Sequence, residues 1–356
     1  MWAMLIGIIL REGSFHAVEA LVRSPARRRL GVGRVFGDDT LAYFTERLAP
    51  AGLRGALVDV LKVAKRNKAF ENTLYIGLAL DGTGAARCSA ARCSLCHPVK
   101  NEKGDLLCHL HHFSMVAIVG TGLSLPFDVE PYGPKDCEYN ASQRLLERVV
   151  TALGPRFAQY VVGDGEYATA PFLHLATRLG LKVIARLKAN LPDLKAQAKA
   201  FFADKPPTST AQIGKDRVEM WDADHFDPWE SLEWETVRVF RYRQHKPDGR
   251  VVEAEWLTNF ATNRVSTQTL YGLAKSRWEI ENQGFNDAKN RYGMEHICHH
   301  HANSLLVCWL LTTLALTIER LYRLRYLHRG NHHPMKPIDL LRLLRLQLGA
   351  LRADTS

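Results

Sequence analysis

The chain has 356 residues, 46% of them hydrophobic and 24% charged, which is ordinary for a soluble globular protein with a sizeable core. Its length predicts two or three modules rather than one compact domain. The 47 Lys and Arg residues exceed the 37 Asp and Glu residues and give a net charge of +10. This excess favours a polyanionic partner, most simply nucleic acid, over the alternative of a merely basic protein.

Two apolar segments and the cysteines bear on the compartment. Residues 1–10, "MWAMLIGIIL", are about half the ~20 residues that span a bilayer and follow no basic segment, so they predict a buried helix and no signal peptide. Residues 304–322 continue at helical spacing into Glu319 and Arg320, which indicates a core helix. Five of the seven cysteines lie between Cys88 and Cys137, a clustering typical of metal ligands or free thiols. We therefore expect a cytoplasmic protein without a membrane partner.

Residues 1–70 predict a helical module with a basic joint in its middle. The sequence "GDDT" at 37–40 supplies a helix N-cap, and a run of arginines precedes it. We expect Arg27, Arg28 and Arg29 to contact DNA phosphates, which makes this segment a candidate DNA-binding module. An exposed, solvated loop is the alternative.

Strand patterns begin near residue 73. Three apolar runs with glycine-containing joints predict an antiparallel meander, and helix and strand patterns then alternate. This order predicts an α/β fold with a mixed sheet and helices on its faces, and residues 71–195 form the first part of that core. The strands are expected at 73–84, 111–122, 123–132, 158–167 and 181–190, and the helices at 141–154 and 170–180.

The rhythm changes at residue 196. Residues 196–261 read as strands separated by polar turns and predict a β-rich insertion. Helical periodicity resumes near Ser266, so residues 262–327 are expected to complete the core. Residues 328–356 form a basic C-terminal tail.

Two aspartates interrupt apolar strand ends. Asp81 stands in "LALDGTG" and Asp164 in "VVGDGEY", each followed by glycine. A carboxylate at such a place is costly unless water or a cation solvates it, and a divalent metal would relieve the repulsion between two of them. Two ordinary turn aspartates are the alternative.

A third carboxylate lies on the helix that contains "RWEIENQGFNDAKNRYGME". Arg277, Glu281, Phe285 and Lys289 are four residues apart, so they form one slanting stripe that drifts by ~40° per step. Glu281 could thus face a metal while the two cations reach phosphate oxygens. An exposed salt-bridge stripe is the alternative, and Glu279 is the rival carboxylate on another face.

These residues resemble those of a DDE-type insertion-sequence transposase with a ribonuclease-H-like core, over roughly residues 73–325. The family places its first Asp on strand one, its second after strand four, and its Glu on a helix that follows a β insertion. The resemblance implies that Asp81, Asp164 and Glu281 bind two Mg²⁺ or Mn²⁺ ions about 3.5–4 Å apart. It also implies that the ions activate water and then a DNA 3′-hydroxyl, and that the protein acts in DNA recombination.

The family subgroup carries Tyr, Arg, Glu and Lys around its glutamate, here matched by Arg277, Glu281 and Lys289. Seven residues rather than six separate Glu281 from Lys289, and Ala274 stands where the tyrosine is expected. Tyr271, one turn away, is the substitute that we expect to contact DNA.

The resemblance further implies double-stranded DNA as the partner, both the inverted repeats at the element ends and the target. It implies a homodimer on that DNA in the nucleoid, and Trp278 offers an aromatic surface for an unstacked base. The alternatives are a nuclease on the same core without strand transfer, a decayed or domesticated DNA-binding protein, and a zinc-dependent interaction protein.

A cysteine and histidine cluster spans residues 88–112. Cys93 and Cys96 have the CxxC spacing of a zinc site, and His109 and His111 would share one face of a following strand. We expect these four to bind a structural Zn²⁺, with Cys108 or His112 as substitutes and free thiols as the alternative. A second cluster, "MEHICHHHANS" at 294–304, predicts a DNA-facing or capping loop rather than a metal site.

Overall fold

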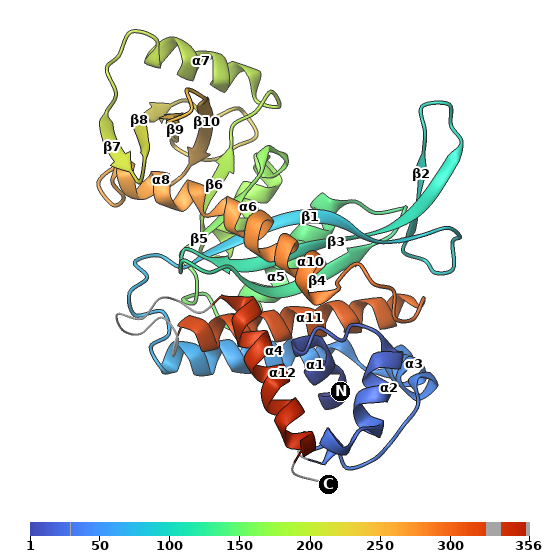
Figure 1. The fold of residues 1–356 in the computed structure, drawn as a ribbon. Helices are drawn as coiled ribbons and strands as arrows, with labels where there is room; N and C mark the ends of the chain where they lie inside the picture. The colour runs from blue at the N-terminus through green and yellow to red at the C-terminus, as the bar shows by residue number, and fades with distance from the viewer. Residues whose placement is uncertain (29, 325–335, 354–356) are drawn as a thin grey trace.

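The computed structural model describes residues 1–28, 30–324 and 336–353 (Figure 1). The helices are α1 (Trp2–Ile9), α2 (Phe15–Arg23), η1 (Pro25–Arg27), α3 (Asp38–Arg47), α4 (Pro50–Arg66), α5 (Glu138–Leu153), η2 (Gly165–Tyr167), α6 (Ala170–Arg178), α7 (Pro192–Phe202), α8 (Thr267–Lys275), α9 (Arg277–Glu279), the π-helix η3 (Ile280–Phe285), α10 (Asn286–Tyr292), α11 (Ala302–Tyr322) and α12 (Pro337–Ala353). The strands are β1 (Gly77–Cys88), β2 (Cys96–Lys100), β3 (Leu106–Val119), β4 (Leu125–Tyr132), β5 (Tyr160–Gly163), β6 (Lys182–Arg186), β7 (Ser209–Ile213), β8 (Asp216–Phe226), β9 (Val237–His245) and β10 (Val251–Thr258).

Five strands form the centre of the fold in the spatial order β4-β3-β1-β5-β6. Strands β1, β3 and β4 are antiparallel neighbours, whereas β5 and β6 run parallel to β1. The two parallel strands are reached through α5 and α6, since a parallel connection needs a crossover. This is the ribonuclease-H-like mixed sheet that the sequence predicts, so the fold class is confirmed.

The insertion continues the same sheet. Strand β10 pairs antiparallel with β6, and β9, β8 and β7 follow it to give ten strands in one sheet. Helix α7 ends within residues 196–261, which the sequence predicts to be β-rich, and the sequence pattern does not predict this helix. Its sequence "PDLKAQAKAFF" has proline at the first position and an acidic first turn, both favourable for a helix start. Figure 1 shows α7 above these strands at one end of the molecule.

Strand β1 lies further along the chain than predicted. The sequence predicts a strand at 73–84 with Asp81 at the end of its apolar run, whereas β1 runs from Gly77 to Cys88, so Asp81 lies inside the strand and that part of the prediction is wrong. The extra residues pair with the first half of β3, and β2 pairs with the same half from the other side. Strand β3 pairs with β1 on one side and with β2 on the other, so its backbone groups are hydrogen-bonded there. The local pattern of glycines does not reveal this pairing.

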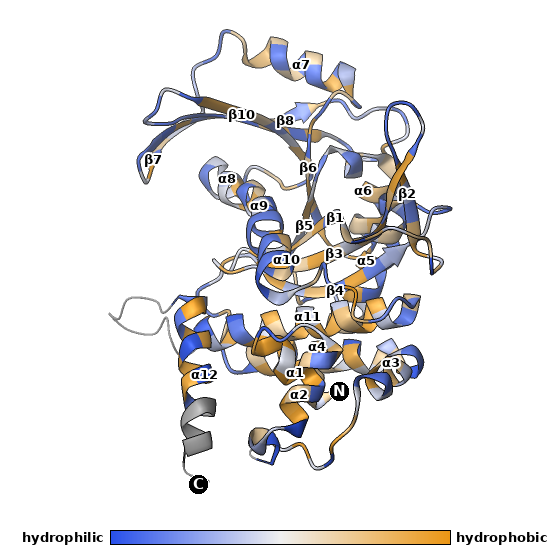
Figure 2. Ribbon diagram, turned by 45° about the vertical axis from the view of Figure 1, so that its right-hand side comes forward, coloured by the Kyte–Doolittle hydropathy of each residue, from blue (hydrophilic) through white to orange (hydrophobic). Residues whose placement is uncertain are grey.

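The N-terminal helices share the core of the sheet domain. Helices α1, α3 and α4 pack against α11, which lies under the sheet in Figure 2. Among the described helices α11 alone is long and apolar enough to cross a membrane, but 72% of its apolar window is buried inside the protein. It is a core helix, as predicted. Helix α12, within the predicted basic tail, reaches the N-terminal region through Arg345, which donates to the Leu10 carbonyl over 2.7 Å.

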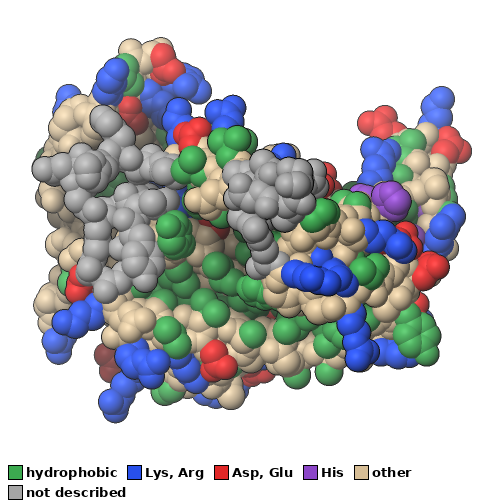
Figure 3. Space-filling model, turned by 60° about the horizontal axis from the view of Figure 1, so that its bottom comes forward, with side chains coloured by type: hydrophobic (Ala, Val, Ile, Leu, Met, Phe, Trp, Pro, Cys, Tyr) green, Lys and Arg blue, Asp and Glu red, His purple; other side chains and the backbone are tan. Residues whose placement is uncertain are grey.

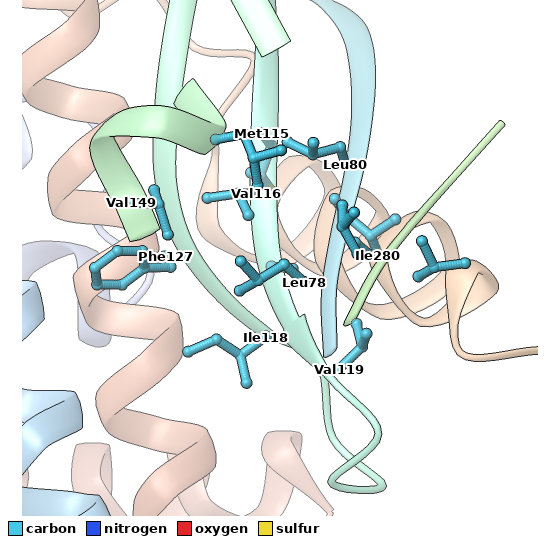
Figure 4. Packing of buried hydrophobic residues seen from close by; sticks show 14 of the residues in the cluster. Leu78, Leu80, Met115, Val116, Ile118, Val119, Phe127, Val149 and Ile280 are labelled. Carbon is cyan, nitrogen blue, oxygen red and sulfur yellow. The ribbon is translucent and has the colours of Figure 1, made fainter. Parts of the chain in front are cut away.

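Apolar residues fill both faces of the central strands. Phe127 and Val149 pack on one side of β1 and β3, and Ile280 packs on the other (Figure 4). Figure 3 shows a further apolar area on the lower face of the molecule, bordered by lysines and arginines. Ile280 is fully buried and directly precedes Glu281, so the packing of η3 fixes where that carboxylate lies.

Candidate active site

The first two carboxylates lie side by side because their strands are parallel neighbours. Strands β1 and β5 pair in register up to Ala79 and Val162. Asp81 and Asp164 are each two residues further along. Asp164 also begins the short helix η2, where its carboxylate accepts the backbone N–H of Gly165.

The third carboxylate is joined to the first by an arginine. The Arg277 side chain is 8% exposed and lies 3.5 Å from Asp81 Oδ2 through Nη1 and 3.3 Å from Glu281 Oε2 through Nη2. The sequence predicts that Arg277 holds DNA, whereas here its guanidinium bridges two carboxylates. Glu281 itself is half exposed, so it lies at the mouth of the site.

The helix that carries Glu281 is a π-helix in its central turn, Ile280–Phe285. A π turn holds roughly 4.4 residues and an α turn about 3.6, so one of each spans about eight residues. Lys289 is eight positions after Glu281, and the wide turn therefore returns it to the same side. The family has six residues between its glutamate and its lysine, and the wide π turn accommodates the seventh residue found here.

Lys289 is anchored on β1, on the same strand as Asp81. Its Nζ donates to Thr83 Oγ1 over 2.6 Å and to the Gly84 carbonyl over 2.7 Å, and lies 3.7 Å from Glu295. The lysine thus connects α10 to the strand that bears the first carboxylate.

Lys188 is a cation of this site that sequence reasoning missed. It follows β6 in the loop after residue 186, and its Nζ lies 2.6 Å from Asp164 Oδ1. Burial opposes ionisation of Asp164, but the Lys188 ammonium and the Gly165 N–H outweigh it and lower the pKa of that carboxyl. The sequence "ARLKAN" contained the signal for this contact, because it places Lys188 just after β6, the parallel neighbour of β5.

Glu138 is a fourth carboxylate that sequence reasoning also missed. It is the first residue of α5, and its carboxylate overlaps the position that a Cβ would take on Gly82, next to Asp81. Burial, followed by repulsion from Glu138 and Glu281, raises the pKa of Asp81 to about 6 although Arg277 attracts its charge. Burial is thus the main reason that ionisation of Asp81 is unfavourable, and the neighbouring carboxylates add to it.

A hydrogen-bond chain holds Glu138 in place. Tyr167 donates to Glu138 Oε1 over 2.9 Å, Ser142 Oγ lies 2.9 Å from the Tyr167 hydroxyl, and Ser114 Oγ lies 2.5 Å from Ser142 Oγ. Both serines are fully buried. The chain links the acidic site to the interior of β3.

The donor set fits a hard divalent cation. Asp81, Asp164 and Glu281 offer carboxylate oxygens, which Mg²⁺ prefers. Burial, and after it the nearby carboxylates, raise the pKa of Asp81, and a bound cation would favour its charged form. Arg277 and Lys188 supply part of that charge here. In the described part of the chain, the oxygens of these three carboxylates do not all lie within 4.8 Å of one another.

The other predicted DNA contacts lie in different settings. Trp278 is partly buried, edge to face with Trp256 at 5.6 Å, with Lys275 Nζ 4.6 Å from its ring centre. Tyr271 is buried and its hydroxyl donates to Gln244 over 3.4 Å, so it packs against the insertion.

The N-terminal arginines differ in exposure. Arg27 is half-buried in η1 and Arg28 is exposed, whereas Arg29 lies outside the described residues.

The predicted zinc ligands are only partly brought together. Cys96 and His111 belong to a four-residue group whose other members are Cys88 and His300. Cys93 lies beside it, 3.6 Å from Cys96 Sγ, while His109 is not among the four. The set differs from the prediction because β1 extends far enough to bring its last residue to β2 and β3. In addition, the loop after α10, predicted to be no metal site, supplies a histidine.

The sequence matches the family model described as the transposase DDE domain over residues 73–318, more than half of its length. The chain belongs to this family of transposase domains. Among solved structures it is similar to a piggyBac transposase, in a cryo-EM structure of a synaptic complex with hairpin DNA, at 11% identity and a TM-score of 0.40. The alignment covers 76% of this chain and 52% of that one, so the matched region spans about half of the solved chain. No curated protein matches the sequence.

Proposed function

We propose that this protein is a DNA transposase that cuts DNA at the ends of an insertion sequence and joins the ends to target DNA. The observation that carries the proposal is the family match over residues 73–318, which contains all three carboxylates on the expected elements. The contact of Arg277 with both Asp81 and Glu281 supports the assignment, since it joins residues about 200 positions apart.

In this proposal Asp81, Asp164 and Glu281 hold two Mg²⁺ or Mn²⁺ ions. Such a pair activates the attacking oxygen and stabilises the leaving oxygen of a phosphodiester displacement. The protein has to present Asp81 ionised, and its pKa of about 6 leaves it mostly charged at neutral pH. Until metal ions bind, Arg277 and Lys188 offset part of the negative charge of the carboxylates.

The proposed partner is double-stranded DNA, bound by a homodimer in the cytoplasm. The net charge of +10 supports a polyanion, since each cation that neutralises a phosphate releases a counterion. Lys289, Arg27 and Arg28 are proposed phosphate contacts, and Trp278 with Lys275 forms an aromatic and cationic surface suited to a base.

The test is Mg²⁺-dependent cleavage and joining of DNA that carries the element's own terminal repeats. We expect Glu281→Gln to bind this DNA as well as wild type and to lose at least ~100-fold in cleavage rate, since one charge on the metals is removed. Glu279→Gln is the matched control on the same helix. Its carboxylate is buried, accepts the Gly120 N–H over 3.2 Å and has a pKa raised by burial to about 6, so an amide replaces it with little change.

Three outcomes contradict parts of the proposal. Equal cleavage by wild type and Glu281→Gln would make Glu281 a salt-bridge residue. Cleavage without joined products would favour a nuclease on the same core. Binding of DNA without cleavage by the wild type would favour a non-catalytic DNA-binding protein.

A further inference from the structure

Four side chains converge beyond the acidic site, three from residues 88–111 and one from the loop before α11. They are Cys88 at the end of β1, Cys96 at the start of β2, His111 in β3, and His300 in the loop before α11. Their ligand atoms all lie within 4.8 Å of one another. The carboxylates of the active site take no part in this group.

The separations within the group match a tetrahedral metal site. Zinc lies about 2.3 Å from thiolate sulfur and 2.0–2.1 Å from imidazole nitrogen, so neighbouring corners of its tetrahedron are roughly 3.3–3.8 Å apart. Here Cys96 Sγ lies 3.3 Å from both His111 Nε2 and His300 Nε2, the two imidazole nitrogens are 3.2 Å apart, and Cys88 Sγ is 3.9 Å from His300 Nε2.

The backbone fixes two of these groups in the required orientation. His111 is fully buried, and its Nδ1 lies 2.6 Å from the carbonyl of Ala86, which turns Nε2 towards the thiols. Zinc-bound histidines typically donate their second nitrogen in this way. Ala86 itself has a φ of +54°, and the register of β1 on β3 shifts between Ala85 and Cys88. This irregularity changes the direction of the last residues of β1.

We propose that Cys88, Cys96, His111 and His300 bind one structural Zn²⁺ ion. Four protein ligands close the coordination sphere, so the ion holds structure and performs no catalysis. It ties the loop that follows α10 to the hairpin formed by β1, β2 and β3, across 212 residues between Cys88 and His300.

The position of the site gives the ion a specific task. Lys289 in α10 bonds Thr83 and Gly84, which lie on β1 between Asp81 and Cys88. The zinc site would therefore secure the loop that follows this helix to the same strand, beyond the lysine.

Cys93 is the competing thiol. Its Sγ lies 3.6 Å from Cys96 Sγ and 3.4 Å from His111 Nε2, but it is outside the group of four. Because two thiolates suffice for the site, we assign Cys93 to the surroundings of the ion rather than to its first coordination sphere.

The first test measures zinc by elemental analysis in the purified full-length protein, and the absorption spectrum after replacement by Co²⁺. We expect about one zinc per chain and a tetrahedral cobalt spectrum with thiolate charge-transfer bands, and chelation should lower the Tm of the wild type. A metal-free protein, or an octahedral cobalt spectrum, would overturn the proposal without the need for any variant.

The second test uses variants. Cys88→Ser and His300→Ala should lose most of the bound zinc, whereas Cys93→Ser and the exposed controls Cys137→Ser and His301→Ala should keep it. His300→Cys retains a ligand and should restore binding, which separates loss of a ligand from failure to fold. Retention of zinc by His300→Ala, or its loss in Cys93→Ser but not in Cys88→Ser, would refute this ligand set.

Discussion

At the scale of single residues, burial and neighbouring charges together set how readily the carboxyls of the acidic site ionise. Asp81 is largely buried beside Glu138, and Gly82 makes that approach possible because any Cβ there would overlap the glutamate. Burial also raises the pKa of Glu138, although the Tyr167 hydroxyl partly stabilises its charge. Burial therefore disfavours the charged forms of both carboxyls, and a bound divalent cation would favour them.

We predict that Asp81→Asn stabilises the metal-free protein at neutral pH. A carboxyl whose pKa rises from 3.8 to about 6 on folding costs stability as the pH climbs from ~4 to ~6, and the cost is complete above ~6. Removing it should raise the free energy of unfolding at pH 7 by about 1–3 kcal/mol. Chemical denaturation at pH 4, 5, 6 and 7 in a chelator checks this.

The difference between the two proteins should be well under ~1 kcal/mol at pH 4, because Asp81 is protonated in the folded state and only about half ionised in the unfolded state. Added Mg²⁺ should raise the stability of wild type more than that of Asp81→Asn. A variant that is less stable than wild type at pH 7 would show that the contact with Arg277 outweighs the repulsion.

At the scale of elements, the π-helix carries the third carboxylate. Single π turns occur frequently at functional sites. Here the turn allows two contacts to form at once, Arg277 with Glu281 and Lys289 with Thr83. Gly284 lies within this turn and is buried, in contact with the Ile280 side chain. The extra residue thus widens the helix without moving either contact.

We predict that deletion of Asn282 is tolerated. Asn282 is exposed within η3, and its removal would turn the π turn into an α turn while Glu281 and Lys289 stay on one side. The Tm should change by no more than a few degrees. Deletion of Asn290, which is equally exposed but lies in regular α10, should rotate the following residues by ~100° and destabilise the protein strongly.

Thermal unfolding and terminal-repeat cleavage of both deletion proteins give the comparison. Similar losses of Tm in the two proteins would mean that η3 is required as a π-helix, rather than a means of absorbing one residue.

At the scale of the whole molecule, one buried ion pair joins the insertion to the start of α8. Arg238 on β9 is 2% exposed and pairs with Asp222 on β8, which is 3% exposed. The same guanidinium donates to the carbonyls of Phe260 and Val265, and Asp222 also accepts from Thr267 at the start of α8. The pair therefore fixes how the insertion meets the core.

We predict that Arg238→Ala lowers the free energy of unfolding by about 3–5 kcal/mol, because it leaves Asp222 buried without its partner. Arg250→Ala is the control on the same insertion, since its pair with Asp248 is mostly exposed and should contribute less than ~1 kcal/mol. Urea denaturation of the three proteins measures both values. A loss below ~1 kcal/mol for Arg238→Ala would mean that water or a rearranged side chain solvates Asp222.

The N-terminal segment also belongs to this scale. Its helices α1, α3 and α4 cover α11 and share one apolar core with the sheet. The sequence predicts residues 1–70 as a DNA-binding module, and their role in DNA binding stays a prediction. Their packing shows that they also complete the core around α11.

The sequence by itself determined the features that follow from local pattern. Strand and helix periodicity predict the order of the core elements, and the apolar stretch at 304–322 predicts a core helix, because periodic burial leaves a direct trace in the sequence. The family was also readable, since Asp81, Asp164 and Glu281 occur in the right order along elements of the right type.

Only the tertiary structure decided which distant groups meet. Glu138 reaches Asp81 because α5 packs against β1, and Lys188 reaches Asp164 because β5 and β6 are neighbouring strands. His300 reaches Cys88 across 212 residues. The π turn likewise arises from packing of Ile280 on the sheet at one end and anchoring of Lys289 at the other. Such contacts depend on long-range pairing and register, which a local pattern of residues does not encode.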